Sequence, residues 1–170
     1  GTVTGVQTCA LPICDYWLAP RPGSEPLMLL GFAHVILRDN LVAWDFVRDW
    51  VDWRAYQRAK GRAEDFASFQ RDLAADYAFA TPQHVGEVCG LDPRVVDEVG
   101  REIGKAGSAF ASHVWRNTAA GNEGGWSTAR NLQFVGVLVG AVGTIGGTAG
   151  SGTHKFVPAP FSKPRPQDVW

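Results

Sequence analysis

The stretch from Ser108 to Phe156 constrains the fold more than any other part of this sequence. It begins with an apolar run typical of a β-strand, SAFASHVW, and continues through a turn of small residues, RNTAAGNEGG. From Trp126 to Val139 the apolar residues recur at helical spacing, and a glycine-rich segment follows. Strand, turn, helix and glycine loop is the order in which α/β proteins present backbone N–H groups to a phosphate or a large cofactor. The stretch therefore predicts an α/β fold with a Rossmann-like strand–helix unit.

Residues 132–150 carry no charged side chain, and Gly136 and Gly140 form a GxxxG pair, so a membrane span has to be considered. Against a span, the run contains Gln133 and Thr144, and its second half is too rich in glycine to favour a helix. No cluster of basic residues anchors either end of the run. We therefore predict a buried helix followed by a loop, with no direct membrane span.

Length, charge and cysteine spacing limit the functional classes. At 170 residues the chain is long enough for one domain or two small ones. A formal net charge of −1 gives no electrostatic reason to expect nucleic acid as a partner. The three cysteines, Cys9, Cys14 and Cys89, show no metal-ligand spacing, so we predict no metal site built from them. The seven tryptophans are compatible with interfaces or large cofactor surfaces, but core packing is the interpretation that we favour.

Residues 1–14 have neither helical nor strand periodicity. Val3 to Ile13, VTGVQTCALPI, resembles the translation of a common sequencing adapter, so we interpret 1–14 as an artefact and exclude it from the fold. The alternative is a genuine irregular N-terminus. The adapter interpretation implies that the natural protein extends further upstream and that this chain is a fragment.

The segment between residues 15 and 107 is predicted to be rich in helices. Asp15–Pro22 is typical of a short strand that ends in a proline turn. Apolar periodicity, N-cap residues and glycine stops then predict five helices. These run from Ser24 to about Asn40, Ala43 to Lys60, Phe66 to Tyr77, Thr81 to Gly90, and Asp92 to Lys105. We place a boundary near 78–80, which separates units at 15–78 and 79–156, and the proline-rich residues 157–170 form an extended tail.

Five motifs along the chain resemble those of one protein family. They are Asp15–Leu18 (DYWL), Arg21–Glu25 (RPGSE), Gly31–Val47 with HVILRDNLVAWDFV, the turns at Thr81-Pro82, Cys89-Gly90 and Ala106-Gly107, and Gly140–Gly147 (GAVGTIGG). Together, and in this order, they are similar to the catalytic subunit of molybdopterin oxidoreductases of the dimethyl sulfoxide reductase family. The glycine loop departs from the family pattern at Val139 and Ala141, where threonine and asparagine are usual.

The resemblance implies a molybdenum or tungsten atom held by two pyranopterin guanine dinucleotides, with the units at 15–78 and 79–156 as two α/β cofactor-binding segments. The cofactor performs the redox chemistry on a small-molecule substrate, while the protein orients the cofactor. Glycines let the backbone approach a pterin or a pyrophosphate closely.

Residue by residue, the resemblance implies three groups of contacts. The first group binds the cofactor's nucleotide end, with Glu25 accepting hydrogen bonds from the guanine: Gly23, Ser24, Glu25, Ser112, Trp115, Arg116, Gly121, Gly124 and Gly125. The second group shapes the loop near the pterin: Gly140, Gly143, Gly146 and Gly147. The third group lies on the substrate side: Trp50, Trp53 and His113. The alternatives are a helix-stabilising acid for Glu25 and a surface arginine for Arg116. For the two tryptophans we favour core packing over a role on the substrate side.

The family's metal-ligating residue and its iron–sulfur cysteines would lie upstream of this chain. We therefore expect the chain alone to have no turnover and to retain no metal cofactor. Its partners would be the rest of the catalytic subunit and an iron–sulfur electron-transfer subunit. Two alternatives are a stand-alone Rossmann-type nucleotide-binding module and a non-catalytic interaction domain. The turn AAGNEGG lacks the GxGxxG spacing that a Rossmann module needs.

Overall fold

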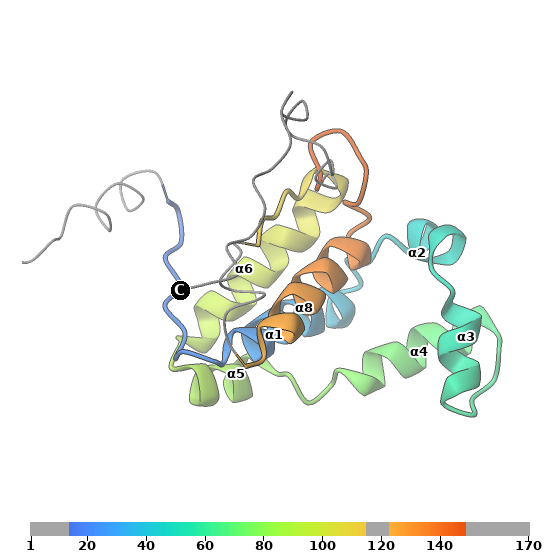
Figure 1. The fold of residues 1–170 in the computed structure, drawn as a ribbon, viewed down its shortest axis with the longest axis horizontal. Coiled ribbons are helices and arrows are strands. Elements are labelled where there is room, and N and C mark those ends of the chain that lie inside the picture. Colours follow the sequence, from blue (N-terminus) through green and yellow to red (C-terminus); the bar gives the residue numbers. More distant parts are fainter. Residues whose placement is uncertain (1–13, 115–122, 149–170) are drawn as a thin grey trace, which may run out of the picture.

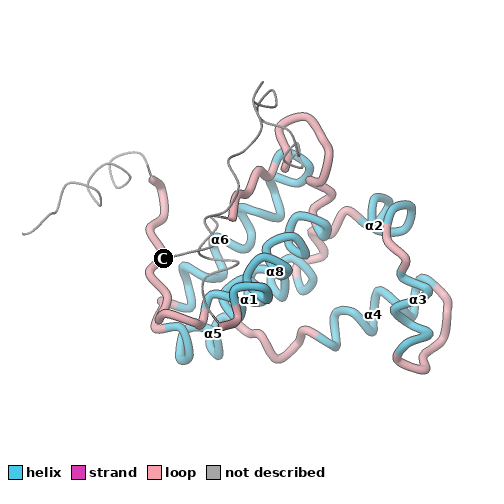
Figure 2. The backbone as a smooth tube through the Cα atoms, viewed as in Figure 1, coloured by secondary structure: helices cyan, strands magenta, loops and turns pink. Residues whose placement is uncertain are grey.

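The structure is a computed structural model that describes residues 14–114 and 123–148. These residues form helices joined by loops (Figures 1 and 2). In chain order the elements are α1 (Glu25–Arg38), α2 (Trp44–Trp50), α3 (Trp53–Ala59), α4 (Phe66–Asp76), α5 (Pro82–Cys89), α6 (Pro93–Ala106), the 3₁₀ turn η2 (Gly107–Ala109) and α8 (Gly125–Leu138).

Helices α1, α6 and α8 form the body of the molecule, with α5 packed against α1 and α6 (Figure 1). Glycines set the close approach of α6 to α1. A Cβ on Gly100 would lie 2.8 Å from the Cβ of Val35, and one on Gly104 would lie 2.6 Å from Cδ1 of Leu41. The later residue of α6, Gly104, contacts the later residue of the partner segment, Leu41. The residue numbers therefore rise in the same direction on both sides, so α1 and α6 are parallel.

Helix α8 runs in that direction as well. Near its middle, the side-chain amide of Asn131 donates to the carbonyl oxygen of Pro26 at 3.0 Å. At its end, the carbonyl oxygen of Leu138 accepts from the N–H of Ala43 at 2.8 Å. All three helices of the body therefore begin at one end of the molecule and finish at the other, as Figure 1 shows.

Helices α2, α3 and α4 form an arm beside the body (Figure 1). Its core is aromatic, with the ring of Trp53 5.2 Å from that of Phe66 and 6.0 Å from that of Phe69 between centroids. The arm is joined to the body through α2 on α8 and α4 on α1. The ring of Tyr77, which ends α4, also lies 4.8 Å from that of Phe134 on α8.

Several predicted helices are confirmed because their end signals act locally. Thr81 and Asp92 cap α5 and α6 by accepting the backbone N–H groups of His84 and Arg94. Gly90 ends α5 in the left-handed conformation, at φ 75°. The helices predicted from residues 24, 66 and 126 likewise correspond to α1, α4 and α8.

The prediction of a single helix over 43–60 is wrong, because α2 ends at Trp50 and α3 begins at Trp53. Val51 is extended, with φ −108° and ψ 135°. The carboxylate of Asp52 then accepts the N–H of Ala55 at 3.0 Å and starts α3. An aspartate in this position favours a new N-cap over a continuous helix.

The predicted α/β class with a Rossmann-like strand–helix unit is also wrong. Across 14–114 and 123–148 there is no strand, and one isolated bridge joins Val142 and Thr148. Part of the predicted strand, from Phe110 to Val114, is irregular. The N–H of Ser112 donates to the Thr148 side chain at 3.0 Å, where a strand would need a neighbouring backbone ladder. The strand predicted at Asp15–Pro22 is also absent, because no strand forms over these residues.

Among the described residues, no helix is long and apolar enough to cross a membrane. The division near 78–80 stays a prediction. Three predictions lie outside the described residues: the adapter-like residues 1–13, the site residues Trp115, Arg116 and Gly121, and the proline-rich tail.

Candidate functional site

The turn from Arg21 to Glu25 lies at the beginning of α1 and is fixed by α5. The N–H of Arg21 donates to the carbonyl oxygen of Cys89 at 2.8 Å. Its guanidinium donates to the carbonyl oxygens of Glu87 and Val88 at 2.8 and 2.9 Å. Arg21 therefore satisfies the last carbonyl groups of α5 and compensates the negative end of that helix.

The predicted residues Gly23, Ser24 and Glu25 lie together in this turn. Gly23 has φ 87°, and the space beside its Cα is open. Ser24 occupies the N-cap position, but its hydroxyl donates to the carbonyl oxygen of Arg21 at 2.6 Å and does not cap the helix. Glu25 is the first helical residue and is half-buried, so its carboxylate lies at the positive end of α1.

Helix α8 begins close to this turn. Gly124 precedes the helix at φ 83° and provides no side-chain cap. The N–H groups of Gly125, Trp126 and Ser127 have no acceptor among the described residues. Asn131, which bonds to Pro26, is six residues beyond Gly125, so α8 begins about 9 Å before α1 along the common helix direction, at 1.5 Å per residue. The fold thus brings the predicted Gly23–Glu25 and Gly124–Gly125 to one end of the body.

The glycine loop lies at the other end. It follows α8, and a Cβ on Gly140 would lie 3.0 Å from that of Ala43, just beyond α1. Gly146 lies against Ala109, just beyond α6. Because α1 has 14 residues, this loop and the Gly23–Glu25 turn are separated by about 21 Å. The structure therefore does not bring the two predicted glycine regions together.

Within the loop, most of the order comes from its own hydrogen bonds. The N–H of Gly147 donates to the carbonyl oxygen of Thr144 at 3.1 Å, with Gly146 between them at φ 81°, as in a type II turn. A Cβ on Gly147 would overlap the carbonyl oxygen of Ala141 and lie 2.7 Å from that of Ser108. The protein's own packing thus requires glycine at 147, whereas Gly143, at φ 74°, has open space beside it.

Ser112 and His113 lie next to the glycine loop. The Ser112 hydroxyl is 3.2 Å from the Thr148 hydroxyl, and Thr144 donates to the carbonyl oxygen of Ser108 at 2.7 Å. His113 is exposed. These threonine contacts had no signal in the sequence, because they join positions 36 residues apart.

The two tryptophans predicted on the substrate side differ in their surroundings. Trp53 is 4% exposed, and its indole N–H donates to the carbonyl oxygen of Arg48 at 3.3 Å. It belongs to the aromatic core of the arm. Trp50, the last residue of α2, is 79% exposed.

Comparison with known proteins shows which proteins the chain resembles. No protein-family model matches the chain. It is 27% identical over 140 residues to YnfE of Escherichia coli strain K12, and 25% identical over 140 residues to dimethyl sulfoxide reductase DmsA of the same strain. Each match covers 81% of this chain. The chain is a relative of the dimethyl sulfoxide reductase family. The resemblance drawn from the motifs is thereby confirmed.

The family relationship extends to a reductase of another substrate. The molybdopterin-containing subunit ArrA of arsenate respiratory reductase from Shewanella sp. strain ANA-3 is 24% identical over 143 residues, which cover 77% of this chain. The chain spans about one sixth of the length of these relatives. Homologues of this chain are thus molybdopterin-dependent reductases, and the chain corresponds to a small part of each.

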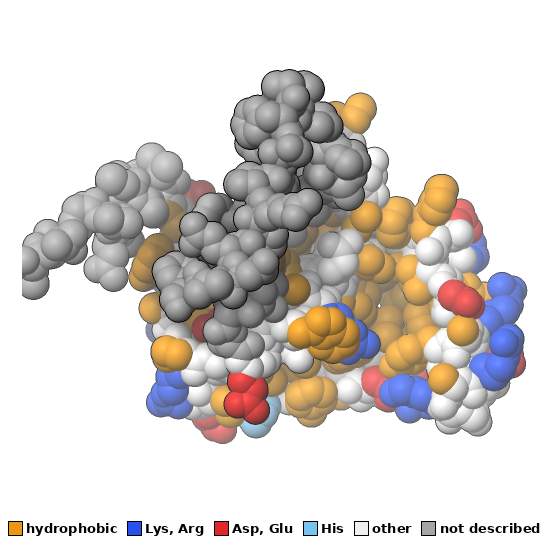
Figure 3. Space-filling view, in the orientation of Figure 1, with side chains coloured by type: hydrophobic (Ala, Val, Ile, Leu, Met, Phe, Trp, Pro, Cys, Tyr) orange, Lys and Arg blue, Asp and Glu red, His pale blue; other side chains and the backbone are white. Residues whose placement is uncertain are grey.

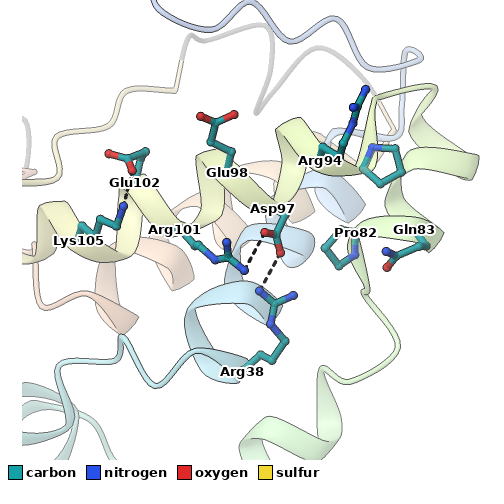
Figure 4. A pocket seen from close by; sticks show the side chains of 10 residues that line it. Arg38, Pro82, Gln83, Arg94, Asp97, Glu98, Arg101, Glu102 and Lys105 are labelled. Carbon is teal, nitrogen blue, oxygen red and sulfur yellow. Dashed lines mark hydrogen bonds and ion pairs between the residues drawn. The ribbon is translucent and has the colours of Figure 1, made fainter.

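The charged clusters contain none of the residues predicted to bind the cofactor. A pocket of about 560 Å³ between α1, α5 and α6 contains paired charges, with Asp97 contacting Arg38 and Arg101 at 2.7 and 3.0 Å (Figure 4). Beside it, hydrogen bonds from Arg38 and Arg101 lower the pKa of Asp39 well below its usual range. Among the described residues, no group of three His, Cys, Asp or Glu side chains is placed to hold a metal ion.

Proposed function

We propose that the chain is part of the catalytic subunit of a molybdopterin-dependent oxidoreductase and supplies part of the wall around its cofactor. The observation that carries this proposal is the similarity to molybdopterin reductases over four-fifths of the chain. The cofactor is proposed to be a bis-pyranopterin guanine dinucleotide with molybdenum or tungsten. When bound, it supplies the redox chemistry on a small-molecule substrate.

The beginning of α8 suits a phosphate of that cofactor. The N–H groups of Gly125, Trp126 and Ser127 have no acceptor in the described part of the chain, and the positive end of a 14-residue helix favours an anion. The absence of a side chain at Gly124 leaves the approach to these amides open. In this proposal α8 holds the pyrophosphate by backbone hydrogen bonds.

The Gly23–Glu25 turn suits the guanine of the same nucleotide. The carboxylate of Glu25 can accept hydrogen bonds from the guanine amino edge, and the open space at Gly23 lets a flat ring approach the backbone. A carboxylate repels a phosphate, so the acid and the free amides take different parts of the ligand. The offset of about 9 Å along the helix direction between the two helix beginnings allows that division.

The glycine loop is proposed to line the pterin side. It lies at the C-terminal, negative ends of α1, α6 and α8, where a phosphate is disfavoured. The N–H groups of Val142 and Ile145 donate to no backbone carbonyl among the described residues, and Gly143 has open space beside it. A neutral, hydrogen-bonding ring suits such a surface better than an anion does.

Cofactor analysis of the longer subunit tests the proposal. The open reading frame that contains residues 15–170 is expressed whole and purified, and molybdenum, tungsten and guanine nucleotide released by acid are measured. We expect metal and nucleotide in stoichiometric amounts. A folded, purified subunit with neither metal nor guanine nucleotide would refute the proposal.

Matched variants locate the role of α8. Gly124→Val adds a branched side chain at a position with φ 83° and blocks the approach to the free amides, so we expect a loss of bound nucleotide of more than tenfold. Gly61→Val is the control, because Gly61 has φ 64° and open space but lies in the arm. Equal loss in both variants would show general destabilisation and contradict the role of α8. The 170-residue chain alone is expected to retain no metal.

A further inference from the structure

An apolar cleft separates the arm from α8. It has a volume of about 170 Å³, and Figure 3 shows hydrophobic side chains gathered along the hollow in this part of the molecule. Val51, Phe69 and Leu73 line it from the arm, and Phe134 and Val137 line it from α8. Two tyrosines, Tyr56 and Tyr77, also line the cleft, and the hydroxyl of Tyr56 donates to the carboxylate of Asp76. The cleft therefore offers an almost entirely apolar surface.

The size of the cleft defines what fills it. A cavity of about 150 Å³ lined by apolar side chains takes one benzene molecule. The cleft is of that size, so it accommodates one aromatic ring or one branched aliphatic side chain, and not a helix.

Arg130 defines the charge of the occupant. It lines the cleft from α8, and its guanidinium lies 5.5 Å from the ring centroid of Trp126. Within residues 14–114 and 123–148, Arg130 forms no ion pair with a carboxylate, whereas Arg62 and Lys60 both pair with Asp76. An arginine held on an exposed tryptophan beside an apolar cleft favours an occupant with a nearby acidic residue.

The length of the relatives identifies the source of the occupant. This chain spans 17% of YnfE and of DmsA, so more than four-fifths of such a polypeptide lies outside it. Trp126 on α8 and Trp50 on α2 are 70% and 79% exposed. The two helices that line the cleft therefore carry further apolar surface that a docked segment can cover.

We propose that the cleft receives one aromatic or branched aliphatic side chain from a segment of the same subunit outside residues 1–170, with an aspartate or glutamate of that segment on Arg130. This inference rests on the proposed function, because it requires the longer subunit. The docked segment joins the arm to α8 and fixes the orientation of α8, whose first residues are proposed to hold the phosphate.

Site-specific photo-crosslinking in the full subunit tests the proposal. Arg130 is replaced by a diazirine-bearing lysine, which keeps the positive charge, and the linked peptide is identified by mass spectrometry. The control places the same residue at Gln133, which is exposed on α8 and does not line the cleft. We expect position 130 to capture a peptide from outside residues 1–170 that contains an acidic residue, with at least fivefold less capture of that peptide from 133.

A second variant separates the cleft from the charge. Val137→Trp fills the cleft, so it should lower the capture at position 130 at least fivefold, and Gln133→Trp should leave it unchanged. Capture within residues 15–148, capture of a second copy or of another protein, or no capture above the control would each overturn the proposal. Molybdenum is measured on the same samples. If the subunit binds metal but no peptide is captured, the docking proposal fails and the proposed function stands. If the peptide is captured but no metal is bound, the proposed function fails and the docking proposal stands.

Discussion

Gly100 gives the sharpest test of how the body is packed. It lies in α6 against Val35 of α1, and Val35 is fully buried. A Cβ at residue 100 would lie 2.8 Å from Cβ and 3.0 Å from Cγ1 of Val35. Because the Cβ of Val35 is fixed to its own backbone, a rotamer change cannot relieve the overlap. Gly100→Ala therefore forces α1 and α6 apart.

The magnitude follows from two opposing effects. Alanine is more favourable than glycine inside a helix by about 1 kcal/mol. Overpacking a well-packed core costs about 1–3 kcal/mol, and contact with a fixed Cβ belongs in the upper part of that range. We therefore expect Gly100→Ala to lower the free energy of unfolding by about 1–2 kcal/mol. At about 2–4 °C per kcal/mol, this corresponds to a fall in Tm of roughly 2–8 °C.

Gly136→Ala is the matched control. Gly136 is also buried inside a helix, α8, but the nearest atom to its added Cβ is Cγ2 of Val142 at 3.9 Å. The propensity gain then acts alone, and we expect stabilisation by up to about 1 kcal/mol. Urea unfolding followed by far-UV circular dichroism gives both changes as shifts of the midpoint at constant slope. Shifts of the same sign in both variants would refute the packing argument.

Three further outcomes are expected. Asp76 accepts hydrogen bonds from Arg62 and from two neighbours, so Asp76→Asn should lower the free energy of unfolding by about 2 kcal/mol in urea titrations. Hydrogen bonds to Arg62 and to Arg38 lower the pKa of Asp76 and of Asp39, so their stabilisation is complete above the ordinary carboxyl pKa of about 4. The urea midpoint should therefore hold between pH 7 and 5 and fall below pH 4, less steeply in Asp76→Asn. Gly147→Ala should speed limited proteolysis of the glycine loop more than Gly143→Ala, because the Cβ at 147 would overlap protein atoms and the one at 143 would meet none.

The sequence allowed the helices to be predicted wherever their ends are chemical signals. Thr81-Pro82 and Asp92-Pro93 start helices by side-chain capping and a fixed φ, and Gly90 ends one by its left-handed conformation. These interactions join residues within one turn of each other. They are therefore visible in the sequence without knowledge of the tertiary structure.

The fold class could not be predicted in this way, because a strand is defined by its partner. The run at 108–114 has the apolar character of a strand, yet Ser112 bonds to the side chain of Thr148 and no ladder forms beside it in the described part of the chain. The helix predicted over 43–60 failed for a local reason, since the apolar periodicity outweighed the capping aspartate at 52 in the prediction. The periodicity of apolar residues alone does not show where one helix ends and the next begins.

The arrangement of the candidate site required the parallel packing of α1, α6 and α8. The resemblance assigns Gly23–Glu25 to the nucleotide end of the cofactor and the glycine loop to its pterin, and α1 places these two regions at its opposite ends. What adjoins Gly23–Glu25 is the beginning of α8, through the bond from Asn131 to Pro26. A single side-chain contact across 105 residues has no local signature.

The surroundings of each glycine separate those that serve the fold from those available to a ligand. Gly100 and Gly147 are required by the protein itself, because an added Cβ would meet Val35 or the loop's own carbonyl oxygens. Gly23, Gly124 and Gly143 have open space beside them, so nothing in the described residues explains them by packing. Their left-handed conformations, at φ 87°, 83° and 74°, account for glycine locally and also leave the backbone exposed. Counting glycines in the motifs therefore overestimates the cofactor surface, and these three positions are where a pterin or phosphate contact is to be sought.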